Sequence, residues 1–186
     1  EAVVLVVVLL GLYLGSWRAA LTAAIVLPFA ALITFLLMDA SSMSANLMSL
    51  GGLVIAIGML VDSSIVIVEN IVASLALHSQ KNEAGVGRLP ILHVIYRAVR
   101  EVAMPVTAGI VIIIIVFLPL LTLQGLEGKL FGPVTLTIVF ALLGSLGVSL
   151  TIVPALASVL VNAGSHREPW LARTLSALYE PSLNWA

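Results

Sequence analysis

The sequence predicts an all-α integral membrane protein with five transmembrane helices, followed by a C-terminal amphipathic helix at the membrane interface. Apolar residues make up 61% of the 186 residues and charged residues only 9%, whereas soluble domains have about 45–50% and about 25%. A soluble fold would therefore have too few polar side chains to cover its surface. The apolar residues also form long runs, and most of the charges lie between those runs.

Five apolar runs approach the roughly 20 residues that an α-helix needs to cross the hydrocarbon core of a bilayer. We expect transmembrane helices at about residues 2–15, 19–38, 47–72, 102–123 and 133–161. Buried strands are also rich in Val and Ile, but runs of this length without alternation favour helices. Interior prolines are compatible with membrane helices, and Pro133 suits a helix start. The first run is short for a span and no signal peptide is visible, which predicts a piece of a longer protein.

The residues after the last predicted span, 162–186, have a different composition. One face of a helix there would carry Trp170, Leu171, Leu175, Leu178 and Tyr179. Aromatic and aliphatic residues on one face are typical of a helix that lies on the membrane surface. A linker to a soluble domain remains the alternative.

Basic residues are distributed unevenly between the segments that join the predicted spans. One side has Arg18, Lys81, Arg88, Arg97, Arg100, Arg167 and Arg173, and the other side has only Lys129. By the positive-inside rule, the first side is cytoplasmic. The loop predicted at about 73–99 and the tail are therefore expected to be cytoplasmic, and the loops at 39–46 and 124–132 to face outward.

Two carboxylates, Asp62 and Glu69, are the only charged residues between Asn46 and Ala76. Seven residues are nearly two helical turns, so both would project from the same face, about 10 Å apart along the axis. Asp62 falls near the middle of its span and Glu69 near the cytoplasmic end. A charged aspartate at the bilayer centre costs at least about 2.5–3.5 kcal/mol. This cost predicts that Asp62 is a proton-relay carboxylate, with Glu69 as a secondary relay residue.

A structural role, in which the carboxylates only hydrogen-bond neighbouring helices, is the alternative for both. Ser63, Ser64 and Asn70 are expected to form hydrogen bonds between helices. Small residues that allow close helix packing are expected at Gly51, Gly52, Gly58, Gly144 and Gly147. No basic residue lies within the five predicted spans, so an ionic partner of Asp62 would come from another part of the protein.

Two motifs give the sequence a resemblance to a known family. Residues 49–71, SLGGLVIAIGMLVDSSIVIVENI, resemble the fourth transmembrane helix of the resistance-nodulation-division (RND) efflux permeases. Residues 121–137, LTLQGLEGKLFGPVTLT, resemble an outward loop of the heavy-metal branch, where an EG-x-EG-x-LF-x-P pattern recurs; here Gln124 replaces the first Glu. The resemblance covers essentially the whole chain. It implies helices two through six of the permease and the surface helix that joins its two halves.

The resemblance assigns the family's intramembrane proton-relay aspartate to Asp62 and its downstream glutamate to Glu69. Multidrug members generally carry two adjacent aspartates, whereas Ser63 follows Asp62 in this chain. This difference favours the metal branch.

The resemblance leaves the transported metal open. Copper and silver members tend to have methionines where this chain has Leu60 and Ile67, and zinc, cobalt and cadmium members often have an aspartate in place of Ala56. Met48 does match a methionine of the copper and silver series. Soft thioethers suit Cu(I), so Met43, Met48 and Met59 could be metal ligands, with packing as the alternative role. Met48 is the candidate that the resemblance favours.

The resemblance implies a segment of a proton-coupled heavy-metal cation efflux transporter of the bacterial inner membrane, and not an enzyme. It implies no bound cofactor: the proton-motive force would drive transport and a transition-metal cation would be the substrate. The implied partners are the lipid bilayer, a homotrimer of the full-length pump, a periplasmic adaptor and an outer-membrane channel, with no nucleic acid. A multidrug-type exporter segment and a non-transporting membrane scaffold remain the alternatives.

Overall fold

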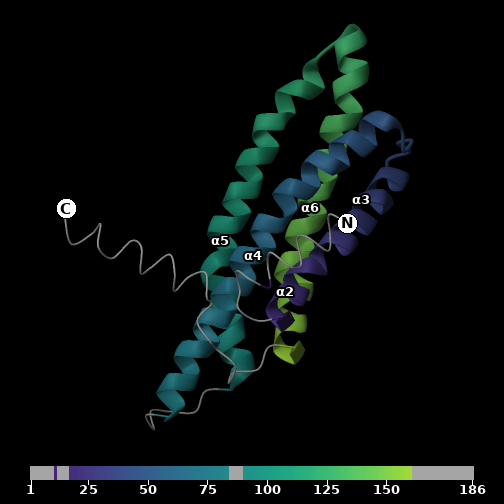
Figure 1. Cartoon of the computed structure of the whole chain (residues 1–186). Coiled ribbons are helices and arrows are strands. Elements are labelled where there is room, and N and C mark those ends of the chain that lie inside the picture. The colour runs from purple at the N-terminus through teal and green to yellow at the C-terminus, as the bar shows by residue number, and fades with distance from the viewer. Residues whose placement is uncertain (1–10, 12–16, 84–89, 161–186) are drawn as a thin grey trace, which may run out of the picture.

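The computed structural model of the chain describes residue 11 and residues 17–83 and 90–160 (Figure 1). Its helices are α2 (Trp17–Ala24), α3 (Val26–Ala40), α4 (Leu47–Glu83), α5 (Ile91–Phe117) and α6 (Gly125–Leu160), with a 3-10 helix, η1 (Leu118–Thr122), between the last two. Four stretches of these residues are long and apolar enough to cross a membrane: Trp17–Ala40, Leu47–Ser79, Ile91–Thr122 and Gly125–Leu160. The predicted all-helical membrane fold is confirmed. Apart from residue 11, the helix expected at 2–15 lies outside the described residues, as does the helix expected at 162–186.

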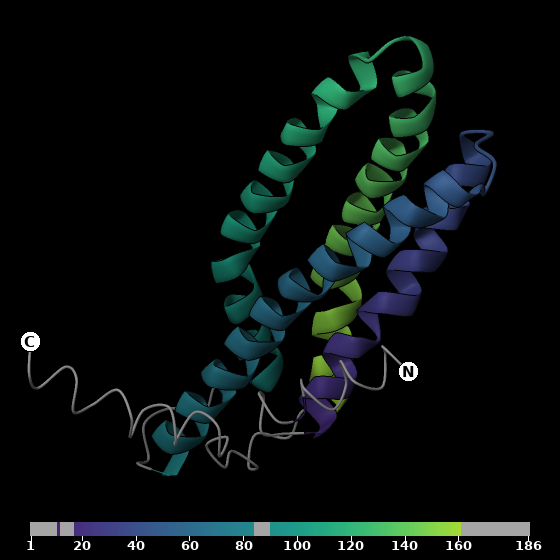
Figure 2. The same ribbon diagram turned by 45° about the horizontal axis from the view of Figure 1, so that its top comes forward.

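The central pair of the bundle is α4 and α6, which pack along each other. The α2–α3 segment packs on one side of this pair and α5 on the other, as the two views in Figures 1 and 2 show. Because α5 returns in the opposite direction, α4 and α6 run parallel. The α3–α4 connection and the turn between α5 and α6 lie at one end of the bundle. The last residues of α4 and α6 and the first of α5 lie at the other end.

The span expected at 19–38 is one apolar stretch with a break at Ile25. Pro28 has no backbone N–H, so the carbonyl of Ala24 loses its usual intrahelical donor. α2 ends at Ala24. The two helical segments stay nearly continuous because the amide of Ile25 donates to the carbonyl of Leu21 at 3.1 Å.

α4 begins with a reciprocal cap. The amide of Ser49 donates to the side-chain Oδ1 of Asn46, and the amide of Asn46 donates to Ser49 Oγ, both at 2.9 Å. These bonds satisfy donors that a helix start leaves free. At its other end α4 continues to Glu83. With α5 starting at Ile91, much of the segment at 73–99 is helical and not the loop that the sequence predicted. Hydropathy marks the apolar part of a helix and misses its polar extension.

The turn from η1 into α6 depends on two glycines of the outward motif. Gly125 has a φ of +72°, in the left-handed region where only glycine is unstrained. A Cβ at Gly128 would collide with the carbonyl oxygen of Leu123. α6 starts at Gly125, so the loop expected at 124–132 is almost entirely helical. The expectation that Pro133 begins this helix was wrong, because Pro133 lies inside α6.

Two of the five glycines that were expected at helix contacts lie at such contacts. A Cβ at Gly52 would lie 2.6 Å from the carbonyl oxygen of Val134 on α6, and a Cβ at Gly144 would lie 2.9 Å from Ile33 Cγ2 on α3. Both glycines therefore bring α6 close to a neighbour. No described atom lies within 4 Å of a Cβ added at Gly51, Gly58 or Gly147, so these three do not serve contacts among the described helices.

Candidate functional site

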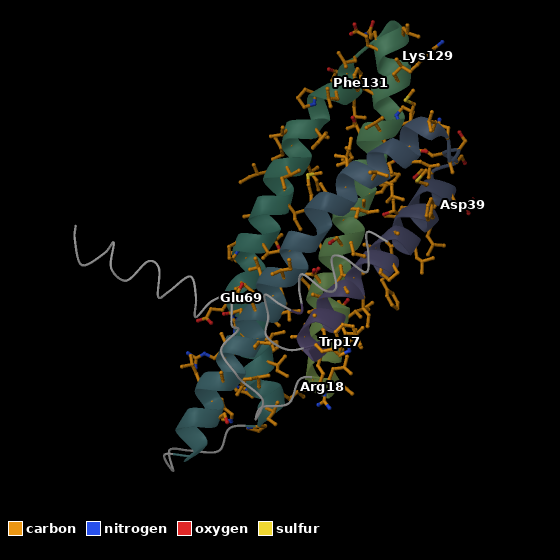
Figure 3. All side chains as sticks on the ribbon, viewed as in Figure 1. Trp17, Arg18, Asp39, Glu69, Lys129 and Phe131 are labelled. Carbon is orange, nitrogen blue, oxygen red and sulfur yellow. The ribbon has the colours of Figure 1, made fainter. Side chains whose placement is uncertain are left out.

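α4 carries both predicted relay residues. Its backbone is helical through Asp62, near the middle of the membrane-crossing stretch Leu47–Ser79. The side chain of Asp62 is outside the described part of the structure. Glu69 lies nearly two turns further along the same helix and is exposed (Figure 3). The face of α4 that carries Glu69 is therefore not covered by the described helices.

The residue after Asp62 links α4 to α6. The hydroxyl oxygens of Ser63 and Ser145 are 3.4 Å apart, at hydrogen-bond distance, and either hydroxyl could donate. Ser145 is buried, and so is Ser64, the residue that follows Ser63 on α4. The expectation that Ser63 bonds a neighbouring helix is confirmed. A short polar contact thus crosses the central helix pair at the depth of Asp62.

The residue after Glu69 links α4 to α5. The side-chain Nδ2 of Asn70 donates to the backbone carbonyl of Ala98 at 2.7 Å, which confirms the expected interhelical bond. Ala98 is buried, as are Val94 and Ile95 in the preceding turn of α5. Each predicted relay position is therefore followed directly by a polar side chain that holds α4 to a different neighbour.

Burial separates the two sides of α4 in this region. The buried residues Ile67, Val68 and Ile71 pack into the core of the bundle, whereas Glu69 is exposed. Apolar packing thus fixes one face of the helix and leaves the carboxylate of Glu69 outside the core.

The structure separates the metal-ligand candidate from the predicted relay. Met48 lies in the first turn of α4 and is 39% exposed. It is about 21 Å from Asp62 along the helix axis. Among the described residues, no group of three or more His, Cys, Asp or Glu side chains could hold a metal ion. The thioether of Met38 is buried and accepts a hydrogen bond from Thr137 Oγ1 at 3.9 Å, so Met38 serves helix packing.

The sequence reasoning missed the partners of these polar side chains. Ser145 lies in the run LLGSLGVS, and a small polar residue in an apolar helix is a signal for an interhelical bond. The carbonyl of Ala98 carries no such signal, because any backbone carbonyl along α5 could accept the bond.

Apolar helices of this length, with ionisable residues inside one of them, define a multi-pass helical membrane protein. Intramembrane carboxylates are rare and usually belong to ion or substrate pathways. The family model of the AcrB/AcrD/AcrF family matches residues 1–186. The chain belongs to this family, within the heavy-metal branch of the RND efflux permeases.

Two relatives and one solved structure illustrate the match. The cobalt-zinc-cadmium resistance protein CzcA of Cupriavidus metallidurans is 41% identical over 184 residues, which are 98% of this chain and 17% of that protein. The nickel-cobalt-cadmium resistance protein NccA of Alcaligenes xylosoxydans xylosoxydans is 40% identical over 191 residues, covering 100% of this chain and 17% of that protein. The crystal structure of a heavy metal efflux pump matches with a TM-score of 0.64 and 35% identity, over 86% of this chain and 14% of that one. The chain therefore spans about a sixth of the length of its relatives.

Proposed function

We propose that the chain is part of a pump that exports divalent transition-metal cations in exchange for protons. The observation that carries this proposal is the position of Asp62 inside a membrane-crossing helix that polar contacts join to both α6 and α5. A charged carboxyl group at this depth has a high free-energy cost. Gain or loss of its proton therefore changes the free energy of the helix in the membrane.

The proposed mechanism couples the protonation of Asp62 to a movement of α4. When Asp62 is charged, a basic side chain from elsewhere in the pump neutralises it; the uncovered face of α4 that carries Glu69 gives such a partner access. When Asp62 is protonated, that attraction is lost and α4 shifts. The contacts Ser63–Ser145 and Asn70–Ala98 pass the shift to α6 and α5. Glu69 receives the proton near the cytoplasmic end.

Divalent cations are the proposed substrates because of the relatives' names. Two of the relatives at 40–41% identity are named for resistance to cobalt, zinc, cadmium and nickel. This supports a metal exporter over the multidrug alternative. The lack of a second aspartate after Asp62 points in the same direction.

Transport by the full-length pump tests the proposal. In proteoliposomes with an imposed pH gradient, we expect transport of Zn²⁺, Co²⁺, Cd²⁺ or Ni²⁺, followed with a metal-sensitive dye, that stops when a protonophore collapses the gradient. Transport of organic dyes and bile salts should not exceed that of protein-free liposomes. Dye transport without metal transport would refute the metal assignment, and metal transport that is insensitive to the protonophore would refute proton coupling.

The pump is proposed to sit in the inner membrane as a homotrimer that works with a periplasmic adaptor and an outer-membrane channel. In this orientation the end of the bundle with Arg18 is cytoplasmic and the end with Lys129 is periplasmic; Figure 3 shows the two residues at opposite ends. The basic residues Arg97 and Arg100 belong to the first half of α5, on the side of Arg18.

Cysteine labelling tests this orientation, since the chain has no cysteine of its own. In a full-length pump without other cysteines, Lys129→Cys should react with a membrane-impermeant maleimide in cells whose outer membrane alone is permeabilised. His93→Cys, which replaces an exposed residue at the start of α5, should react only after the inner membrane is opened. The opposite labelling pattern would show that the bundle has the inverse orientation in the membrane.

A further inference from the structure

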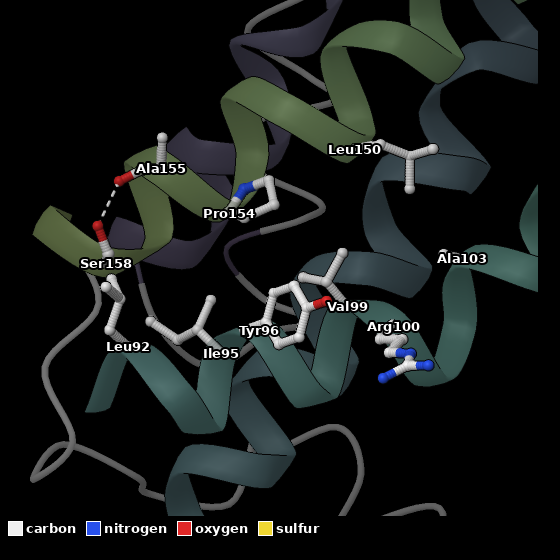
Figure 4. A pocket seen from close by; sticks show the side chains of 10 residues that line it. All are labelled: Leu92, Ile95, Tyr96, Val99, Arg100, Ala103, Leu150, Pro154, Ala155 and Ser158. Atoms are coloured by element: carbon white, nitrogen blue, oxygen red, sulfur yellow. Dashed lines mark hydrogen bonds between the residues drawn. The ribbon is translucent and has the colours of Figure 1, made fainter. Parts of the chain in front are cut away.

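A groove lies between the first half of α5 and the last part of α6 (Figure 4). Its volume is about 470 Å³, within the usual size range of small-molecule sites. Its walls are mainly aliphatic, with Ile95 and Val99 on α5 and Leu150 and Pro154 on α6. The groove therefore suits a hydrocarbon chain better than a hydrated ion.

Two polar side chains of α5, Tyr96 and Arg100, also line the groove. Tyr96 is 64% exposed and Arg100 is exposed as well, so the phenol hydroxyl and the guanidinium are both accessible donors. Among the described residues, no carboxylate lines the groove and Arg100 forms no ion pair. The groove thus carries a positive charge, and the guanidinium of Arg100 is accessible to an anionic partner.

The depth of the groove places these donors near the lipid headgroups. Asn70, which is bonded to Ala98, lies about 12 Å beyond Asp62 along α4. The hydrocarbon core extends about 15 Å from the bilayer centre. Arg100, half a turn from Ala98, is therefore close to the edge of the core, where a long arginine side chain extends toward the headgroups.

We propose that this groove binds an anionic phospholipid of the cytoplasmic leaflet. One acyl chain lies along the aliphatic walls, and the lipid phosphate accepts hydrogen bonds from Arg100 and Tyr96. Basic pockets between transmembrane helices on the cytoplasmic side are suited to anionic headgroups. This site rests on the proposed orientation of the bundle but not on metal export.

Photolabelling of the full-length pump in nanodiscs tests the site. The probes are phosphatidylglycerol and phosphatidylcholine with the same photoreactive acyl chain, and the labelled peptides are identified by mass spectrometry. We expect phosphatidylglycerol to label peptides from 91–103 and 150–158 about fivefold more than phosphatidylcholine, the ratio that corresponds to ~1 kcal/mol for one arginine near an anionic surface. No metal or pH gradient is present, so this result is independent of whether the pump exports metals.

Three variants distinguish lipid binding in the groove from general contact between the pump and lipid. Arg100→Gln should lower phosphatidylglycerol labelling to the level of phosphatidylcholine. Arg97→Gln removes an equal charge from the same helix at a position that does not line the groove, and should leave the labelling unchanged. Val99→Phe enlarges a side chain that points into the groove (Figure 4) and should reduce labelling by both lipids. The proposal would be overturned if both lipids labelled these peptides equally and Arg100→Gln changed nothing. It would also be overturned if neither lipid labelled them, because another part of the pump would then cover the groove.

Discussion

Replacement of Asp62 by Asn is expected to reduce proton-driven metal export by the full-length pump to the level of protein-free liposomes. Asparagine has nearly the same size as aspartate but cannot release a proton, so the helix would stay in its neutral state. The adjacent contact between Ser63 and Ser145 does not depend on a charge at Asp62. Expression and trimer assembly should therefore remain near normal.

The matched control is Glu69→Gln, which removes the other carboxylate of the same membrane-crossing stretch. Glu69 lies about 10 Å nearer the cytoplasmic end of the span than Asp62, where water near the interface can take over its part in proton transfer, so the loss of transport should be smaller. Transport is measured as metal efflux from proteoliposomes with an imposed pH gradient, and assembly by size-exclusion chromatography. If the Asp62→Asn pump transports as well as the unmodified pump, Asp62 is a structural carboxylate and the relay has to be given up.

Replacement of Gly52 by Ala is expected to destabilise the pump by about 1–3 kcal/mol, the usual cost of overpacking. The new Cβ would lie 2.6 Å from the carbonyl oxygen of Val134, 3.1 Å from its Cα and 3.2 Å from its carbonyl carbon. All three atoms belong to the backbone of α6, so no rotamer change can relieve the contact and the two helices must separate.

Two alanine variants calibrate this effect. Gly144→Ala should cost less, because the nearest atom, Ile33 Cγ2 at 2.9 Å, belongs to a side chain that can shift. Gly51→Ala should change stability by less than about 0.5 kcal/mol, since no described atom lies within 4 Å of the new Cβ. The apparent melting temperature of the purified full-length pump ranks the three variants. Equal melting temperatures for Gly51→Ala and Gly52→Ala would contradict the close contact between α4 and α6.

Hydropathy was sufficient to predict the helical membrane fold but not the ends of its helices. The segment after residue 72 contains polar residues that are as compatible with a helix as with a loop, and only the structure shows that α4 continues to Glu83. Pro133 was expected at a helix start because proline suits that position. The left-handed conformation of Gly125 starts the helix earlier, and this conformation has no unambiguous signal in the sequence.

The polar contacts of the candidate site were predictable in kind but not in partner. Ser63 and Asn70 were expected to bond neighbouring helices because polar side chains in apolar helices need partners. Their partners, Ser145 and the carbonyl of Ala98, depend on how each helix is rotated about its axis. The same rotation decides that Gly52 meets α6 while Gly51 does not.

α5 contrasts with the other spans in how it is stabilised. Its membrane-crossing stretch is the most apolar of the four, yet only 6% of its most apolar window is buried, against 40–50% for the other three. Lipid chains are as apolar as leucine side chains, so such a helix partitions into the bilayer without help from protein neighbours. The membrane-crossing stretch of α4, which carries Asp62 and Glu69, inserts less readily and gains more from association. We therefore expect α5 to insert into the bilayer on its own. Among the described helices, its buried residues Val94, Ile95 and Ala98 and the bond from Asn70 to Ala98 then hold it beside α4.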